Sequence, residues 1–120
     1  PQIVAKDVDD KFLMEYFVKH FVPALKDALE ENNYPSSDDE KSGWKLLIGI
    51  RGRIFTIEDD YHVGQDFINY SSIGSGSPYA LGALYASSKA KDPQKILTDA
   101  LKAAELFTTS VCGPFIFEEI

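Results

Sequence analysis

The chain has 120 residues, of which 44% are hydrophobic and 26% charged, and its formal net charge is −7. This length suits one domain with a real core, and no apolar run approaches the roughly 18 residues of a membrane span. The acidic balance argues against nucleic acid as a main partner, because phosphate-binding surfaces need clustered Lys and Arg. The one cysteine, Cys112, cannot form an internal disulfide, which is typical of a reducing compartment and predicts a cytoplasmic protein.

The first predicted element is helical and covers residues 9–32, where apolar side chains recur every three or four residues. His20 falls on this stripe and is interpreted as part of the packed face. Pro23 is expected to kink the helix or to begin a second one. Residues 33–43 are polar and rich in turn formers, which predicts a loop.

A β-hairpin is expected next. Residues 44–50 are apolar on both faces, which predicts a strand buried between layers. A tight turn at 51–52 should lead into a second strand at 53–57, where β-branched and aromatic residues predominate. Residues 58–69 are predicted to be irregular, and residues 70–73 to form a short strand.

Two helices are predicted between residues 78 and 107. Ser77 is expected to cap the first helix and Pro78 to occupy its first position. Gly82 lies inside that helix, where glycine costs about 1 kcal/mol relative to alanine, so we expect it to allow close packing against a neighbour. Asp92 should cap the second helix, and Gly113 precedes a last strand at 114–120.

The glycine-serine turn and the helix after it carry a family resemblance. Residues 73–86 read Ile-Gly-Ser-Gly-Ser-Pro-Tyr-Ala-Leu-Gly-Ala-Leu-Tyr-Ala, which resembles the I-G-S-G-x-P-Y-A-x-G/A signature of proteasome β-subunits and of the bacterial peptidase HslV. Three other segments resemble, in the same order, the family's hairpin, last long helix and closing strand: 46–57, 92–106 and 115–120.

The resemblance implies an α+β fold of the Ntn-hydrolase type, in which helices flank antiparallel sheet in an αββα sandwich. The chain is expected to be a single proteasome-like domain over residues 1–120, or the C-terminal part of one. Its parts would be a helical region at 9–32, strands at 44–73, two helices at 78–107 and a last strand at 114–120.

The resemblance also bears on activity. In this family the nucleophile is a threonine at the N-terminus, whose own α-amino group serves as the base. The sequence begins Pro1-Gln2-Ile3, so the chain is expected to be inactive alone, as a fragment of a threonine peptidase or a degenerate relative. The alternative is a non-catalytic self-assembling or interaction protein with the same fold. Expected partners are further copies of the chain and either a polypeptide substrate or a missing N-terminal segment; no nucleic acid, membrane or cofactor is expected.

The implied site lies at the glycine-serine turn. Ser75 matches the serine that helps to orient the nucleophile, and the amide of Gly76 falls in the same site. The alternative for Ser75 is a turn serine that bonds local backbone. Many β-subunits carry an R-D-x-x-S-G-G segment near the C-terminus; counting back from residues 118–119 puts its aspartate at Thr108 and its serine at Val111.

A cation site is also implied. In HslV-like proteins, backbone carbonyls after the last helix can hold a cation, and carbonyl oxygens suit hard cations. The corresponding carbonyls here belong to Glu105, Thr108 and Val111.

Other candidate sites have simpler interpretations. His62 beside Asp59 and Asp60 suggests a metal or acid–base site, but a solvated loop is preferred. Cys112 has no histidine near it in sequence and is interpreted as structural. The 74–78 turn lacks the lysine of a phosphate-binding P-loop. An N-terminal proline such as Pro1 is the base of tautomerases, but the chain lacks their β-α-β repeat.

Overall fold

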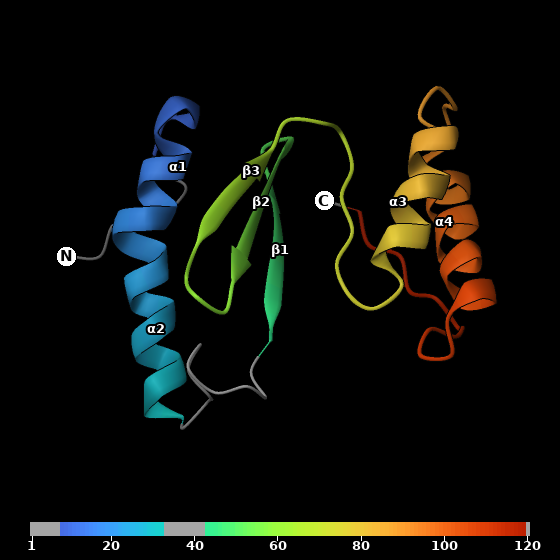
Figure 1. The fold of residues 1–120 in the computed structure, drawn as a ribbon. Coiled ribbons are helices and arrows are strands. Elements are labelled where there is room, and N and C mark those ends of the chain that lie inside the picture. Colours follow the sequence, from blue (N-terminus) through green and yellow to red (C-terminus); the bar gives the residue numbers. More distant parts are fainter. Residues whose placement is uncertain (1–7, 33–42, 120) are drawn as a thin grey trace. The chain divides into compact units, whose positions relative to one another are not determined.

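A computed structural model describes residues 8–32 and 43–119. The chain divides into two compact units, Pro1–Asn69 and Tyr70–Ile120, which are drawn in Figure 1. The expectations for Pro1 and for most of the 33–43 loop lie outside the described residues. None of the described helices is long and apolar enough to cross a membrane.

The N-terminal unit begins with a run of helical turns. The 3₁₀ turn η2 is followed by α1, the π turn η3 and α2, with the bounds Asp10–Phe12, Leu13–Tyr16, Phe17–Phe21 and Val22–Glu31. Pro23 lies in the first turn of α2, directly after η3. A proline has no N–H to donate and crowds the carbonyl four residues earlier. The interruption expected at Pro23 therefore takes the form of a single π turn, in which the N–H of Val22 bonds to the carbonyl of Phe17.

The π turn corrects the interpretation of His20. The buried residues of the helical run are Leu13, Phe17 and Val22, so the spacing between the last two is five rather than three or four. His20 is consequently exposed, and its ring lies 6.0 Å from that of Tyr16. On the exposed surface of the same run, Lys19 donates a hydrogen bond of 2.6 Å to Glu15, and this contact lowers the pKa of the Glu15 carboxyl.

The sheet of this unit has three antiparallel strands in the order β1-β2-β3. Their bounds are Lys45–Ile50, Arg53–Glu58 and Val63–Asp66. Arg51 and Gly52 join β1 to β2, and both have positive φ, as a tight hairpin turn requires. Ile48 pairs with Phe55, and Ile57 pairs with Val63.

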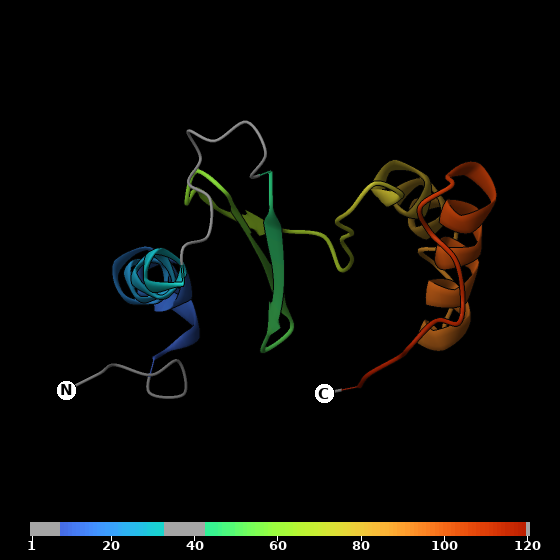
Figure 2. The same ribbon diagram turned by 90° about the horizontal axis from the view of Figure 1, so that it is seen from below.

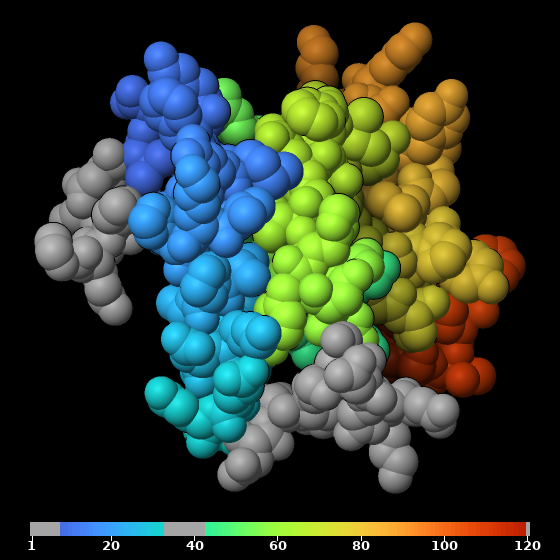
Figure 3. Space-filling view, turned by 60° about the vertical axis from the view of Figure 1, so that its left-hand side comes forward, coloured from blue at the N-terminus to red at the C-terminus, as the bar shows by residue number. Residues whose placement is uncertain are grey.

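The core of this unit lies between the helical run and the sheet. Figure 2 shows the helical run facing one side of the sheet, and Figure 3 shows the outer surface where the atoms of these segments meet. Phe55 and Ile57 are both 0% exposed. The ring of Phe55 lies 4.6 Å from that of Phe17, centroid to centroid. Leu13 completes the fully buried set. The central strand β2 therefore carries the apolar side chains that hold the helix on the sheet.

Four predictions about strands differ from the structure. The segment 44–50 forms β1, but β1 is an edge strand and is partly exposed rather than buried between layers. The segment 58–69, predicted to be irregular, contains β3, because pairing with β2 outweighs the weak strand propensity of its Val-Gly-Gln-Asp sequence. The segments 70–73 and 114–119 form no strand, since no described segment pairs with either of them. Ile120 lies outside the described residues.

The C-terminal unit is built on α3 (Ser77–Ala86) and α4 (Pro93–Phe107), which pack side by side. Ala80 and Leu84 of α3 are buried with Ala100 of α4. Small side chains at this contact allow the two helices to approach closely.

Gly82 does not take part in that contact. A Cβ built on Gly82 meets no atom within 4 Å, so the expectation of close packing there is wrong. The position of close approach is Gly76, immediately before α3. A Cβ built on Gly76 would lie 2.8 Å from the Ala104 Cβ and 3.0 Å from a methyl carbon of Val111. The glycine that the packing requires is therefore the one in the turn.

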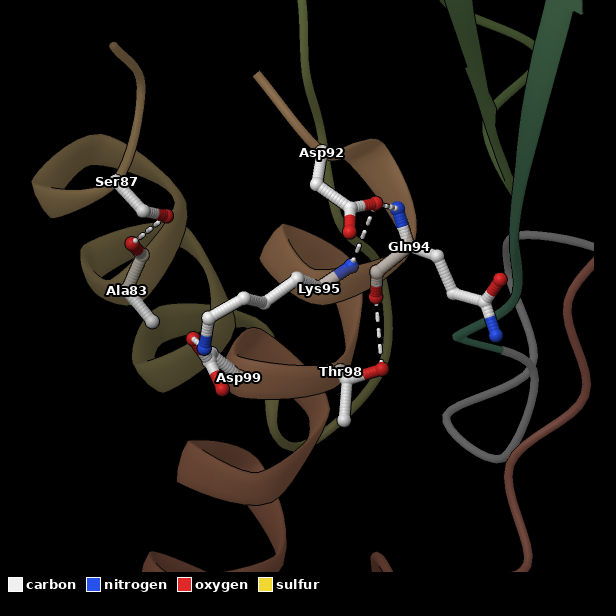
Figure 4. Close-up of polar contacts among 7 residues, drawn as sticks. All are labelled: Ala83, Ser87, Asp92, Gln94, Lys95, Thr98 and Asp99. Atoms are coloured by element: carbon white, nitrogen blue, oxygen red, sulfur yellow. Dashed lines mark hydrogen bonds and ion pairs between the residues drawn. The ribbon is translucent and has the colours of Figure 1, made fainter. Parts of the chain in front are cut away.

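The predicted N-cap of α4 is present. The Asp92 carboxylate accepts hydrogen bonds from the backbone N–H groups of Gln94, at 3.1 Å, and Lys95, at 3.4 Å (Figure 4). The Lys95 ammonium lies 3.2 Å from the carboxylate of Asp99, one turn further along the exposed surface. The same view shows the two side chains pointing toward one another. These contacts fix where α4 begins.

Asp92→Ala should lower the free energy of unfolding by about 1 kcal/mol, because two N–H groups at the start of α4 lose their acceptor. Asp92→Asn keeps an acceptor oxygen and should lose less. Asp99→Ala is the matched control: it removes an exposed ion pair worth about 0.3–0.5 kcal/mol. Urea unfolding followed by circular dichroism measures all three variants, and equal losses for Asp92→Ala and Asp99→Ala would contradict the capping role.

Candidate functional site: the glycine-serine turn

The candidate site lies where the turn before α3 meets the segment after α4. Gly74 has φ +102°, a backbone conformation that glycine adopts without strain. The carbonyl of Gly74 accepts a bond of 3.1 Å from the N–H of Ser77 and closes the turn. Gly76, rather than Ser77, is the N-cap residue of α3. The Ser77 hydroxyl donates to the carbonyl of Ser72 at 2.9 Å, so it fastens the turn to the preceding chain.

The turn presents the side chain of Ser75 to a residue far away in sequence. The Ser75 Oγ lies 2.5 Å from the Ser110 Oγ, and both residues are exposed. Either hydroxyl can donate to the other. Each oxygen keeps further hydrogen-bonding capacity, because a hydroxyl offers one donor and two acceptor sites. A hydroxyl pair of this kind can orient a neighbouring polar group and relay a proton to it.

The close approach at Gly76 brings the two segments together. Gly76 is buried, and a side chain there would collide with Ala104 of α4 and with Val111. The absence of a side chain lets the turn lie against the end of α4. This places Ser75 within reach of Ser110, three residues after the last residue of α4.

The residues after α4 are ordered by local bonds. Thr108 donates both its N–H, at 3.0 Å, and its hydroxyl, at 2.9 Å, to the carbonyl of Ala104. The Glu105 carboxylate accepts a bond of 2.7 Å from the N–H of Gly113. These contacts hold the loop that carries Ser110 against the last turn of the helix.

Sequence reasoning located Ser75 and Gly76 in the turn but missed Ser110. Counting back from residues 118–119 put the matching serine at Val111, whereas the structure brings the preceding residue to Ser75. Val111 instead packs its methyl group beside Gly76. A hydroxyl-rich run, Thr108-Thr109-Ser110, was the available signal. The carbonyl site at Glu105, Thr108 and Val111 stays a prediction.

The carboxylates beside His62, which were candidates for a metal or acid–base site, accept hydrogen bonds from backbone N–H groups. The Asp60 carboxylate accepts a bond of 3.0 Å from the N–H of His62, and the Asp59 carboxylate accepts one of 3.0 Å from the N–H of Gly43. Cys112 is a free, exposed thiol. Across the residues with described positions, no three His, Cys, Asp or Glu side chains are grouped to hold a metal.

Of three comparisons with known proteins, one yields a match, to a solved structure. No family model matches the sequence. A search of curated proteins also finds no match. A solved structure of Thiobacillus denitrificans BPH in complex with epoxomicin, a proteasome-type protein, matches with 30% sequence identity and a TM-score of 0.64. The match covers 86% of this chain and 64% of the BPH chain.

The chain has a proteasome-type fold. The α+β class of the Ntn-hydrolase type, predicted from the sequence, is confirmed. Antiparallel sheet and helices are the parts of that fold which the structure describes. The chain spans 64% of the length of BPH, so the activity of the whole proteasome-type protein does not transfer directly.

Proposed function

We propose that the protein is a self-assembling, proteasome-like subunit of the threonine-peptidase type, in which this chain supplies the support of the site rather than the attacking group. The observation that carries the proposal is the Ser75–Ser110 hydroxyl pair, because it joins the I-G-S-G turn to the segment after the last helix. The proteasome-type fold and the 30% identity to BPH, a protein solved with epoxomicin, support it.

The proposed chemistry follows from the resemblance. A threonine hydroxyl would attack the peptide carbonyl, its own α-amine would accept the proton, and backbone amides would hold the oxyanion. Ser75 and Ser110 would hydrogen-bond that amine and keep it oriented, and the amide of Gly76 would lie beside them. The proposal also includes the cytoplasmic location, the polypeptide substrate and the carbonyl-bound cation at Glu105, Thr108 and Val111.

The second candidate is a non-catalytic assembly protein with the same fold. An exposed aromatic pair at the ends of the two C-terminal helices favours it. The rings of Tyr79 and Phe107 stack 5.5 Å apart, and the neighbouring Leu106 is largely exposed. Exposed apolar patches of this kind are typical of association surfaces.

A fluorogenic peptide assay separates the two candidates. The 120-residue polypeptide, which presents Pro1 at its N-terminus, should show no epoxomicin-sensitive turnover. The full translation product of the gene should show such turnover if it carries the threonine, and mass spectrometry should then detect an epoxomicin adduct. Ser75→Ala and Ser110→Ala in that product should each reduce kcat by about tenfold or more, a part of the roughly 10²–10⁴-fold that a correctly placed general base contributes.

Ser87→Ala is the matched control, because the Ser87 hydroxyl, at the C-cap of α3, donates to the carbonyl of Ala83 one turn earlier (Figure 4). Unchanged kcat in both site variants would remove the proposed role of the hydroxyl pair. A full product with neither turnover nor an adduct would leave the assembly protein as the function.

A further inference from the structure

A second polar site lies in the N-terminal unit, where the residues before α1 meet the turn between β1 and β2. A hollow of about 620 Å³ opens there. Three basic and two acidic side chains line it, together with one valine: Lys11, Arg51, Arg53, Asp9, Asp10 and Val8. The charged lining sums to +1, in a protein whose formal net charge is −7. A local cationic hollow therefore stands out against an acidic background.

The two arginines already hold one carboxylate. The Asp10 carboxylate places one oxygen 3.0 Å from the Arg51 Nη1 and the other 3.6 Å from the Arg53 Nη1. Arg51 also donates to the backbone carbonyl of Val8. The pair is thus arranged to receive the oxygens of an anion, and Asp10 occupies one side of it.

Arg53 has a hydrogen-bond donor group without an acceptor among the described residues. Its Nη1 atom is buried and has no hydrogen-bond acceptor within the part of the chain that the structure describes. The Asp10 oxygen at 3.6 Å is close enough for an ion pair but too far for a hydrogen bond. A buried guanidinium N–H without an acceptor is costly, and such groups commonly contact a bound ion or water.

We propose that this hollow binds a small oxyanion of the carboxylate or phosphate class. Arg53 would be its principal ligand, since the planar guanidinium matches the oxygens of both anions. Lys11 supplies a second positive charge at the rim of the hollow. Asp10 is an internal competitor: its carboxylate shares the two arginines, and solvent does not reach the Arg53 Nη1 while Asp10 is in place, so the anion binds by displacing the Asp10 carboxylate.

Isothermal titration with inorganic phosphate, at constant ionic strength and with the 120-residue chain, tests the site. The wild-type chain should bind one phosphate saturably. Arg53→Gln should weaken binding about tenfold or more, because a hydrogen bond to a charged group is lost. Asp10→Asn should strengthen binding several-fold by removing the competing carboxylate. The two substitutions change the local charge in opposite directions, so a further variant that removes a positive charge outside the hollow is needed to separate binding at the site from a general electrostatic effect.

Lys45→Gln is the control, because Lys45 pairs with Glu58 at 3.4 Å and does not line the hollow. It should leave the affinity unchanged. Lys11→Gln, at an exposed position, tests the site if Arg53→Gln fails to fold by circular dichroism, and it should weaken binding several-fold. A parallel titration with acetate distinguishes the sources: equal affinity indicates a carboxylate site, and a preference for phosphate indicates a phosphate site. Absence of saturable binding to either anion, or equal affinity in wild type, Arg53→Gln and Lys11→Gln, would overturn the proposal.

Discussion

Phe55→Ala should lower the free energy of unfolding by about 3–5 kcal/mol, the cost of removing a large buried aromatic side chain and leaving a cavity. Phe55 is 0% exposed at the centre of β2, and its ring packs on Phe17 of the helical run. Small domains are stabilised by only about 5–15 kcal/mol, so this one substitution should bring the N-terminal unit close to unfolding at physiological temperature.

Phe67→Ala is the matched control, because it removes the same side chain from a position that is 87% exposed. It should change the free energy of unfolding by no more than about 0.5 kcal/mol. Urea unfolding monitored by circular dichroism gives both values. If Phe55→Ala lowers the free energy of unfolding by less than about 1 kcal/mol, the packing of the helical run on the sheet does not depend on this contact. Truncation of a well-packed buried phenylalanine usually costs more.

Two glycine-to-alanine substitutions should have opposite effects. Gly76→Ala should destabilise the protein by about 1–3 kcal/mol, because its methyl group would overpack the contact with Ala104 and Val111. Gly82→Ala should stabilise it by about 0.5–1 kcal/mol, since alanine favours a helix and a Cβ there meets nothing within 4 Å.

Thermal unfolding of the two variants beside the parent measures the difference. A decrease in Tm for Gly76→Ala with an increase for Gly82→Ala would support the packing described for the turn. The reverse order would place the close contact inside α3, as the sequence had suggested.

Local signals in the sequence were sufficient for several elements. The Asp92 cap, the two helices that follow the I-G-S-G turn and the hairpin around Arg51 and Gly52 each depend on neighbouring residues, and their signals are strong. The order of the predicted elements indicated helices packed on antiparallel sheet, and the family resemblance added the Ntn-hydrolase type.

Signals from neighbouring residues do not predict pairing or packing between residues that are distant in the sequence. The segment 63–66 becomes a strand only because β2 supplies its hydrogen-bond partners. Ser110 contacts Ser75 across 35 residues of sequence, and no pattern of neighbouring residues indicates that contact. Gly82 was misjudged because helix propensity shows that glycine is unfavourable there but does not show whether a neighbour is present.

The π turn η3 also changes how this chain aligns with others. One residue corresponds to a rotation of about 100° in an α-helix. Val22 lies five residues after Phe17, and in an unbroken α-helix that extra residue would rotate Val22 away from the side on which Phe17 lies. The π turn takes up the extra residue and keeps both side chains on the same side. A homologue with one residue fewer between these positions would keep both side chains on the sheet by continuing as an ordinary α-helix. A single-residue gap in this segment of an alignment would therefore preserve the core, whereas a gap elsewhere in the helical run would turn its apolar side chains away from β2.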